Sequence, residues 1–352
     1  MQFGVQFFPC VRPHEKDGQT YFEESLQIGE EADALGYTHA RMVEHYFTFY
    51  GGYAPNPIVF LAAMAQRTKK MRLVTGAILP VFNHPLKMAG EIGMLDGISG
   101  GRLDVGVARA FLPHEFRRFR VNLDESYPRF LEGLEQIEML LTQENVTHRG
   151  KFHVIENTTS LPRPTQKPRP KFYIAATLTP ETFEFAGKHG HALMCIPLGG
   201  TRMRELLDIY RKAWRDAGHP GRGEVMMAFH MFCHPDGKTA VDLAAPHVAD
   251  YYAAITGATK DWTEGTSSAS YALYPEAMKM VHASTMQSQM ESGGAWVGSP
   301  EEINAIIEKL VDRVGPFEHA SMQINFGMLP FEEAQRSMRL FAKDVMPRWR
   351  DR

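Results

Sequence analysis

The organisation of the whole chain can be read outward from one stretch, Arg41-Met42-Val43-Glu44-His45-Tyr46-Phe47-Thr48-Phe49-Tyr50. Here an apolar-ended strand, His39–Val43, runs directly into an ionisable pair and an aromatic cluster. A helical pattern, Tyr21–Leu35, precedes it and is closed by Gly36, a glycine of the kind that ends helices. Because α/β proteins build their sites at the carboxyl ends of strands, the stretch predicts a helix–strand unit with Glu44 and His45 at its functional end.

The same alternation of strands and helices extends along the rest of the chain. Further strand candidates are Gln2–Phe8, Met71–Ile78, Arg102–Val107, Lys171–Ala175, Ala192–Ile196, Glu224–Phe232 and Ala320–Phe326. The last helical pattern, Phe331–Val345, is expected to be halted by Pro347. Eight strands, each followed by a helix and with no linker-like break, predict a single α/β domain over residues 1–352, a (β/α)8 TIM barrel.

A doubly wound sheet is the structural alternative to a barrel. That fold carries a glycine-rich dinucleotide fingerprint after its first strand. Here Pro9-Cys10-Val11-Arg12-Pro13 stands at that position instead. The barrel is therefore favoured.

Two insertions exceed what a minimal barrel needs, one after the fourth strand at about 144–170 and one after the seventh at about 257–294. The first contains an alternating segment, Phe152–Ile155, and a proline-rich exit, Leu161-Pro162-Arg163-Pro164, which together predict a small hairpin and an extended connector. The second is rich in Ser, Thr, Ala and Met. It is interpreted either as a lid over the site or as a disordered surface loop.

Composition excludes several classes of partner. Thirty-eight Lys and Arg residues against 41 Asp and Glu give a net charge of −3, without the basic surplus that binding nucleic acid requires. The amino-terminal residues lack a basic leader, and no apolar run reaches membrane-spanning length, so we expect neither export nor a membrane anchor. Cys10, Cys195 and Cys233 are odd in number and widely spaced, which favours a reducing cytoplasm over a disulfide framework.

We also expect no metal. The candidate histidines show no mutual spacing typical of a metal site; they are His14, His84, His114 and His230.

An ordered set of motifs covers nearly the whole chain. The set comprises Met1-Gln2-Phe3-Gly4, Glu44-His45-Tyr46-Phe47-Thr48, Thr75-Gly76-Ala77-Ile78, Asn83-His84-Pro85, Ser99-Gly100-Gly101-Arg102-Leu103-Asp104-Val105-Gly106-Val107-Ala108-Arg109, Val297-Gly298-Ser299-Pro300-Glu301-Glu302 and the stretch from Met338 to Pro347. In this set the chain resembles the bacterial luciferase-like superfamily of flavin-dependent monooxygenases. It is closer to the enzymes of that superfamily that use FMN than to those that use a deazaflavin.

The resemblance implies a catalytic position for His45, which matches a histidine beside the flavin. The chemistry agrees, because forming and consuming a C4a-peroxyflavin requires a group that exchanges protons near neutral pH. Glu44 is the second catalytic candidate. Adjacent strand residues point to opposite faces, so Glu44 is interpreted with equal weight as a brace for the barrel.

Cofactor contacts are also implied by the resemblance. Gly76 and Ala77 match a non-proline cis peptide bond that presses against one flavin face, and Arg109 matches the arginine that holds the FMN phosphate. The segment after the fifth strand reads as a helix start at Thr179-Pro180, whose backbone N–H groups suit an anion. Thr177 and Leu178 depart from the family pattern there, so Thr179 and Thr182 are the expected hydroxyl donors.

The substrate pocket is expected to be apolar, because sheltering a flavin peroxide requires the exclusion of water. Its candidate residues lie at or near predicted strand ends, although barrel core is the commoner explanation for each one singly. These are Phe7, Phe8, Phe47, Phe111, Cys195, Met227 and Phe229, with Phe326 beside them.

Three functional classes follow. The first is a monooxygenase that takes reduced FMN (FMNH2) from a separate NAD(P)H flavin reductase and oxygenates a small apolar substrate, such as an aldehyde, ketone or terpenoid. The second is a deazaflavin-dependent hydride-transfer enzyme. The third is a non-catalytic flavin-binding partner subunit, against which the presence of both His45 and Arg109 argues. The resemblance also implies a homodimer or heterodimer.

Overall fold

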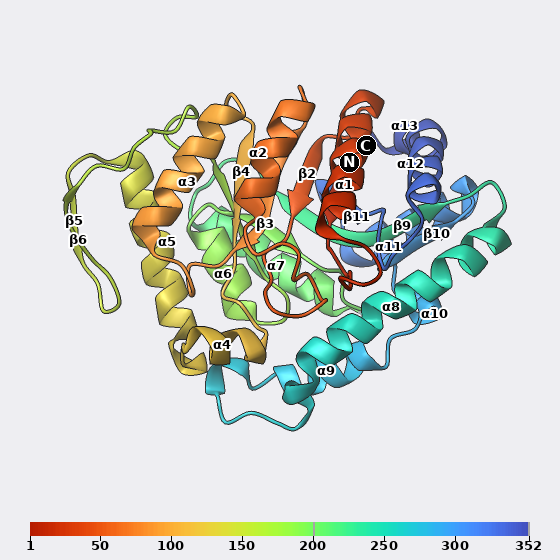
Figure 1. The fold of residues 1–352 in the computed structure, drawn as a ribbon. Coiled ribbons are helices and arrows are strands. Elements are labelled where there is room, and N and C mark those ends of the chain that lie inside the picture. The colour runs from red at the N-terminus through yellow and green to blue at the C-terminus, as the bar shows by residue number, and fades with distance from the viewer. Residues whose placement is uncertain (200, 351–352) are drawn as a thin grey trace.

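Eight parallel strands close into a barrel at the centre of the molecule (Figure 1). The structure is a computed structural model and describes residues 1–199 and 201–350. The barrel strands are β1 (Gln2–Phe7), β2 (His39–Met42), β3 (Arg72–Ile78), β4 (Leu103–Val107), β7 (Lys171–Ala175), β8 (Ala192–Cys195), β9 (Val225–Cys233) and β11 (His319–Gln323). They pair in this order, and β11 pairs with β1 to close the ring. The predicted (β/α)8 TIM barrel is confirmed.

Helices surround the barrel, and each barrel strand is followed by at least one of them (Figure 1). The larger helices are α1 (Gly18–Leu35), α2 (Pro57–Arg67), α3 (Pro85–Ile98), α5 (Ser126–Thr142), α6 (Pro180–Lys188), α7 (Arg202–Asp216), α8 (Gly237–Thr263), α11 (Pro300–Val314) and α12 (Phe331–Asp344). Shorter ones are α4 (Pro113–Phe119), α9 (Tyr274–His282), α10 (Met286–Glu291), α13 (Met346–Trp349) and the 3-10 turns η1 (Leu123–Glu125) and η2 (Ala269–Tyr271). Within the described ranges, no helix is both long and apolar enough to cross a lipid bilayer.

The predicted end of the first helix is confirmed, and the predicted end of the last helix is wrong. Gly36 ends α1 in the left-handed conformation, with φ of 86°, which glycine adopts without strain. Pro347 does not halt the last helix, because α12 ends at Asp344 and Pro347 lies in the first turn of α13. Proline is tolerated there, since first-turn N–H groups have no partner within the helix.

Alternation along the strands decides which side chains face the barrel interior. On β1, Phe3 and Phe7 point outward, and their rings lie 5.3 Å from Phe341 of α12 and 5.1 Å from Phe60 of α2. Gln6 therefore points inward, where its side chain meets that of Arg41 from β2. Outward residues form the layer between barrel and helices, and inward residues form the floor of the mouth.

The first insertion contains a two-stranded hairpin, as predicted. Strands β5 (Val146–Arg149) and β6 (Val154–Thr158) pair antiparallel and project away from the barrel beyond α5 (Figure 1).

Residues 257–294 are mostly helical, since they contain the end of α8, η2, α9 and α10. They do not form the disordered loop that was one interpretation. A ninth strand, β10 (Ala295–Gly298), follows them and pairs with the second half of β9. The sequence analysis missed β10, because only three apolar residues precede Gly298 and such a short run carries no clear periodicity.

Candidate active site

His45 lies just beyond the carboxyl end of β2, at the mouth of the barrel. Its imidazole is surrounded by three aromatic rings, with centroid distances of 5.5 Å to Phe8, 5.3 Å to Tyr50 and 6.0 Å to Phe111. The side chain remains 12% exposed, so one edge of the ring can be reached from the mouth. The structure therefore places His45 in an apolar enclosure with limited access to solvent.

Glu115 holds the imidazole from the first turn of α4. Its Oε1 lies 3.3 Å from Nδ1 of His45 and accepts a 2.9 Å hydrogen bond from the backbone N–H of Tyr46. The Glu115 side chain is fully buried. One carboxylate oxygen thus fixes both the ring and the backbone beside it, which leaves Nε2 of His45 as the nitrogen that can meet a ligand.

A glycine lets the following loop pack against His45. Gly51 has φ of 79°, and a Cβ there would lie 2.8 Å from Cβ of His45. The backbone N–H of Gly51 donates to the carbonyl of Pro9, so this loop is tied to the segment after β1. A larger residue at position 51 would be strained and would displace the imidazole.

Glu44 braces the loops instead of sharing the proton of His45. Its carboxyl accepts a 2.5 Å hydrogen bond from the hydroxyl of Tyr46 and a 3.1 Å bond from Nδ2 of Asn83, whose amide also donates to the carbonyl of Leu79. Burial raises the pKa of Glu44 to about 8. The neutral acid therefore predominates at pH 7, and Glu44 joins the segment after β2 to the segment after β3.

The Gly76-Ala77 peptide bond on β3 is cis, as predicted. Gly76 faces the barrel interior beside Arg41, whose Nη2 donates a 3.1 Å hydrogen bond to the Gly76 carbonyl. A Cβ at position 76 would lie 2.1 Å from Nε of Arg41. Only glycine fits at this point, because the Arg41 side chain packs closely against its backbone.

Arg109 follows β4 and lies beneath the second insertion. Its Nη2 donates a 3.0 Å hydrogen bond to the carbonyl of Ser270, and its guanidinium lies 4.3 Å from the ring centroid of Tyr271. The hydroxyl of Tyr271 donates to the carbonyl of Ala110, and the indole N–H of Trp262 donates to that of Phe111. The segment Trp262–Tyr274 therefore covers the β4 loop; we refer to it as the lid segment.

The predicted phosphate-binding threonines lie next to Arg109 in the barrel order, because β4 and β7 are neighbouring strands. Thr179 is the N-cap residue of α6, with Pro180 in the first turn, but its side chain makes no capping hydrogen bond. Thr177, Leu178 and Thr182 are each partly exposed beside it. The first-turn N–H groups and the Thr179 hydroxyl thus face the same end of the barrel as Arg109.

Only some of the predicted pocket residues gather around His45. Phe8 and Phe111 contact its ring, and Phe326 lies 5.2 Å from His230 in the same mouth. Phe47 is 52% exposed, and its ring lies 5.5 Å from that of Phe119 in a tilted arrangement. This position follows from its left-handed backbone, with φ of 68°, which turns the side chain outward.

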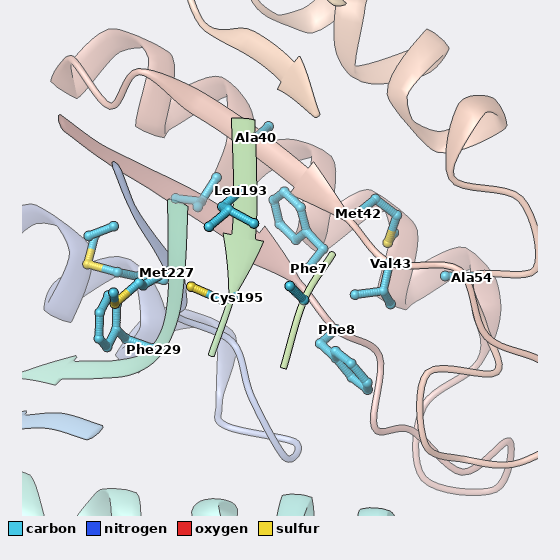
Figure 2. Packing of buried hydrophobic residues seen from close by; sticks show 14 of the residues in the cluster. Phe7, Phe8, Ala40, Met42, Val43, Ala54, Leu193, Cys195, Met227 and Phe229 are labelled. Carbon is cyan, nitrogen blue, oxygen red and sulfur yellow. The ribbon is translucent and has the colours of Figure 1, made fainter. Parts of the chain in front are cut away.

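The remaining four pocket candidates lie away from His45. Phe7 packs outward on α2, since its neighbours Gln6 and Phe8 take the inward positions. Phe229 stacks on Trp296 of β10 at 4.1 Å and lies beside Met227 on β9 (Figure 2). Met227 is paired in register with Cys195 of β8, and both are buried.

Sequence reasoning missed several residues of the mouth. Glu115 is 70 positions from His45, and Tyr251 reaches the mouth from α8, where its ring lies 5.5 Å from Phe8 and 4.5 Å from His230. Arg41 could have been identified from the sequence, because it is a charged residue beside the apolar residues Ala40, Met42 and Val43 of a predicted strand. Across residues 1–199 and 201–350, no group of three or more His, Cys, Asp or Glu side chains is arranged to hold a metal ion.

Comparison with known proteins gives consistent matches over the full barrel. The model of the family described as luciferase-like monooxygenase matches residues 1–316. The oxygenase component of a flavin-dependent trigonelline monooxygenase from Acinetobacter baylyi is 28% identical over 335 residues, which covers 93% of this chain and 89% of that protein.

Solved structures agree with the sequence matches. Monooxygenase RslO1 from Streptomyces bottropensis has a TM-score of 0.88 and 40% identity, covering 99% of this chain and all of the other. The oxygenating constituent of 3,6-diketocamphane monooxygenase from Pseudomonas putida, solved with FMN, has a TM-score of 0.82 and 20% identity, covering 99% and 98%. A coenzyme F420-dependent tetrahydromethanopterin reductase from Methanopyrus kandleri has the same fold, with a TM-score of 0.73, 19% identity and 99% coverage of each chain.

Proposed function

Because the chain belongs to the luciferase-like monooxygenase family, we propose that it is the oxygenase component of a two-component system that uses reduced FMN and O2. A separate NAD(P)H flavin reductase would supply the reduced FMN, and a small, largely apolar substrate would be oxygenated. Family membership makes the chain an oxidoreductase that acts with O2. The proposed two-component oxygenase activity rests mainly on one observation, the pairing of His45 with the buried Glu115 at the barrel mouth.

The residues present fit an FMN molecule. Arg109 and the start of α6 offer a guanidinium, a hydroxyl and backbone N–H groups for a phosphate. Gly76 and Ala77 offer a backbone surface without bulky side chains, against which a flat ring system can lie. Bound there, reduced flavin would supply the electrons that activate O2.

The chain's own residues would then control one proton and the local water. His45 is held through Nδ1 by Glu115, so its Nε2 is presented to the mouth for proton exchange. Phe8, Tyr50 and Phe111 exclude water around it, which suits oxygen chemistry that water would divert to hydrogen peroxide. Glu115 serves as a positioning residue for this imidazole.

A deazaflavin-dependent hydride-transfer enzyme is the alternative on the same fold. The longer acidic tail of that cofactor needs space and positive charge beyond the first phosphate. Here the Ser270 carbonyl and the Tyr271 ring lie directly against Arg109, so an extended tail would meet the lid segment. This contact favours the shorter FMN, and the His45–Glu115 pair favours an enzyme over a non-catalytic partner subunit.

Assembly and location belong to the same proposal. We expect a homodimer or heterodimer, and the three buried thiols, Cys10, Cys195 and Cys233, suit a reducing cytoplasm.

Anaerobic titration of the protein with reduced FMN, and separately with coenzyme F420, tests the choice of cofactor. We expect reduced FMN to bind at least about tenfold more tightly, because its single phosphate needs only the Arg109 site, whereas the longer acidic tail of coenzyme F420 would meet the lid segment. Calorimetry gives both dissociation constants. Tight binding of coenzyme F420 without measurable binding of reduced FMN would overturn the proposal in favour of hydride transfer.

A further inference from the structure

A row of four polar side chains crosses the floor of the barrel mouth. Arg41 of β2, Gln6 of β1, Gln323 of β11 and His230 of β9 occupy matching register positions on four neighbouring strands. All four are at most 8% exposed. We call this set the polar row. Nearby in the interior, Val74, Ala77, Met194 and Met226 form an apolar cluster.

Arg41 is a buried cation without an acidic partner. Its Nη1 and Nη2 donate to two neutral acceptors, Oε1 of Gln6 at 3.0 Å and the Gly76 carbonyl at 3.1 Å. Burial lowers its pKa to about 10, so the guanidinium stays protonated at pH 7. The ionisable groups near it include Cys195 and Tyr251, and burial raises the pKa of each to about 12, so both are neutral. His39 is also near it, and burial lowers the pKa of this imidazole.

The polar row also holds hydrogen-bonding atoms without partners. Nε of Arg41, Nε2 of His230 and Oε1 of Gln323 are buried and make no hydrogen bond. Buried charges are normally paired, and buried polar groups normally bonded, because either omission costs several kcal/mol in general. Burial lowers the pKa of His230 to about 4, so it is neutral and can donate through one ring nitrogen.

The surroundings of the polar row are aromatic. The ring of Tyr251 lies 4.5 Å and that of Phe326 lies 5.2 Å from the His230 ring, and Tyr251 in turn contacts Phe8 and Tyr50 beside His45. A molecule bound at the polar row would contact aromatic rings on its sides and the Arg41 guanidinium at its end. A planar anion, such as an aromatic carboxylate, has both the flat apolar ring and the negative charge that these groups complement.

We propose that the polar row is a substrate-binding subsite that holds the carboxylate of a small aromatic or similarly planar apolar substrate. Arg41 supplies the charge, and Nε2 of His230, as an N–H donor, supplies a further contact that orients the bound group. This inference rests on the proposed function, because it concerns the substrate of the same site. It narrows the substrate class from apolar molecules in general to those with one anionic oxygen group.

Calorimetric titration of the flavin-free protein at pH 7 with benzoate, and with its uncharged counterpart benzamide, tests the proposal. The parent protein should bind benzoate about tenfold or more tightly than benzamide, the usual effect of a charge-assisted hydrogen bond. Arg41→Met should abolish that preference and Arg41→Lys should retain part of it. Arg72→Met, which removes an arginine already paired with Asp104, should leave the preference unchanged.

A second variant keeps the test decisive if Arg41→Met fails to fold. His230→Phe leaves both hydrogen bonds of Arg41 in place and should weaken benzoate several-fold and benzamide less. Equal binding of the two probes by the parent protein would overturn the proposal, and so would unchanged benzoate binding in His230→Phe.

Reduced FMN provides the remaining arm of the experiment. If Arg41→Met weakens reduced FMN tenfold and leaves benzoate unaffected, the charge serves the cofactor and the substrate assignment is wrong. A parent protein that prefers benzoate but does not bind reduced FMN would leave the subsite standing and overturn the proposed function alone.

Discussion

Single side chains of the mouth are held by partners that lie far away in sequence. His45 is held by Glu115, Glu44 by Asn83, and Arg109 by Ser270 of the lid segment. Glu44 and His45 could be found from the sequence because they follow directly after a strand, and Arg109 because it matches a family motif. Their partners could not be found, because no local sequence pattern predicts a contact between residues that are 39 to 161 positions apart in the chain.

Removing the guanidinium of Arg109 should weaken FMN binding and leave the fold intact. Arg109→Ala loses a charge-assisted contact worth about 1.5–3 kcal/mol, so the dissociation constant of reduced FMN should rise more than tenfold. Arg117→Ala is the matched control, because Arg117 pairs with Asp261 nearby and is 63% exposed. Fluorescence titration measures the affinity and circular dichroism the fold. An unchanged affinity in Arg109→Ala would remove this residue from the phosphate site.

Among the elements, those with a clear local sequence pattern were predictable, whatever their length. Gly36 ends α1 as expected, and the alternating segment Phe152–Ile155 lies in the β5–β6 hairpin. Strand β10 was missed because its four residues are identified by pairing with β9 and not by their own pattern. Phe7 was also wrongly expected in the pocket, because its place at a strand end was weighed without the period of two on β1, where Phe3, Val5 and Phe7 share the face toward the helices.

The opposite end of the barrel is held by Glu224, which joins three strands. Its carboxylate accepts hydrogen bonds from Nε2 of His319 at 3.1 Å, Nζ of Lys171 at 2.7 Å and the Tyr173 hydroxyl at 3.0 Å. The bond from His319, followed by that from Lys171, lowers the pKa of Glu224 to about 2 from an ordinary value of 4.5. Because the folded pKa is depressed, this carboxylate stabilises the fold above about pH 4.5, and the contribution is lost as pH falls toward 2.

Glu224→Gln should therefore lower the melting temperature at pH 7, and the gap to the parent protein should shrink below about pH 4.5. Thermal unfolding followed by circular dichroism at pH 7, 4 and 3 measures it. Glu276→Gln, which removes an exposed partner of Lys279, should show little effect at any of these values. A gap that stays constant down to pH 3 would mean that ionisation of Glu224 does not stabilise the barrel.

At the scale of the whole molecule, the candidate active site lies at the carboxyl end of the barrel strands, and the stabilising Glu224 cluster lies at the opposite end. The mouth gathers Phe8, His45, Glu115 and Arg109 from the first, second and fourth βα units, and the lid segment covers Arg109 and the β4 loop. The Glu224 cluster lies at the amino-terminal end of the strands. This separation is common in TIM barrels, and it lets residues of the mouth be changed without loss of the fold.

The central claim is that His45, held by Glu115, moves the proton that couples O2 activation to oxygenation. The most direct test reacts reduced FMN bound to the protein with O2 and a small substrate of the proposed class, and it measures oxygenated product and hydrogen peroxide from the same reaction, for the parent and for His45→Ala. The variant should still bind reduced FMN but should form product about 10²–10⁴-fold more slowly, with the consumed oxygen recovered as hydrogen peroxide. Exposed His14→Ala should behave as the parent. A His45→Ala variant that forms product at the parent rate, with the same pH profile, would contradict the account.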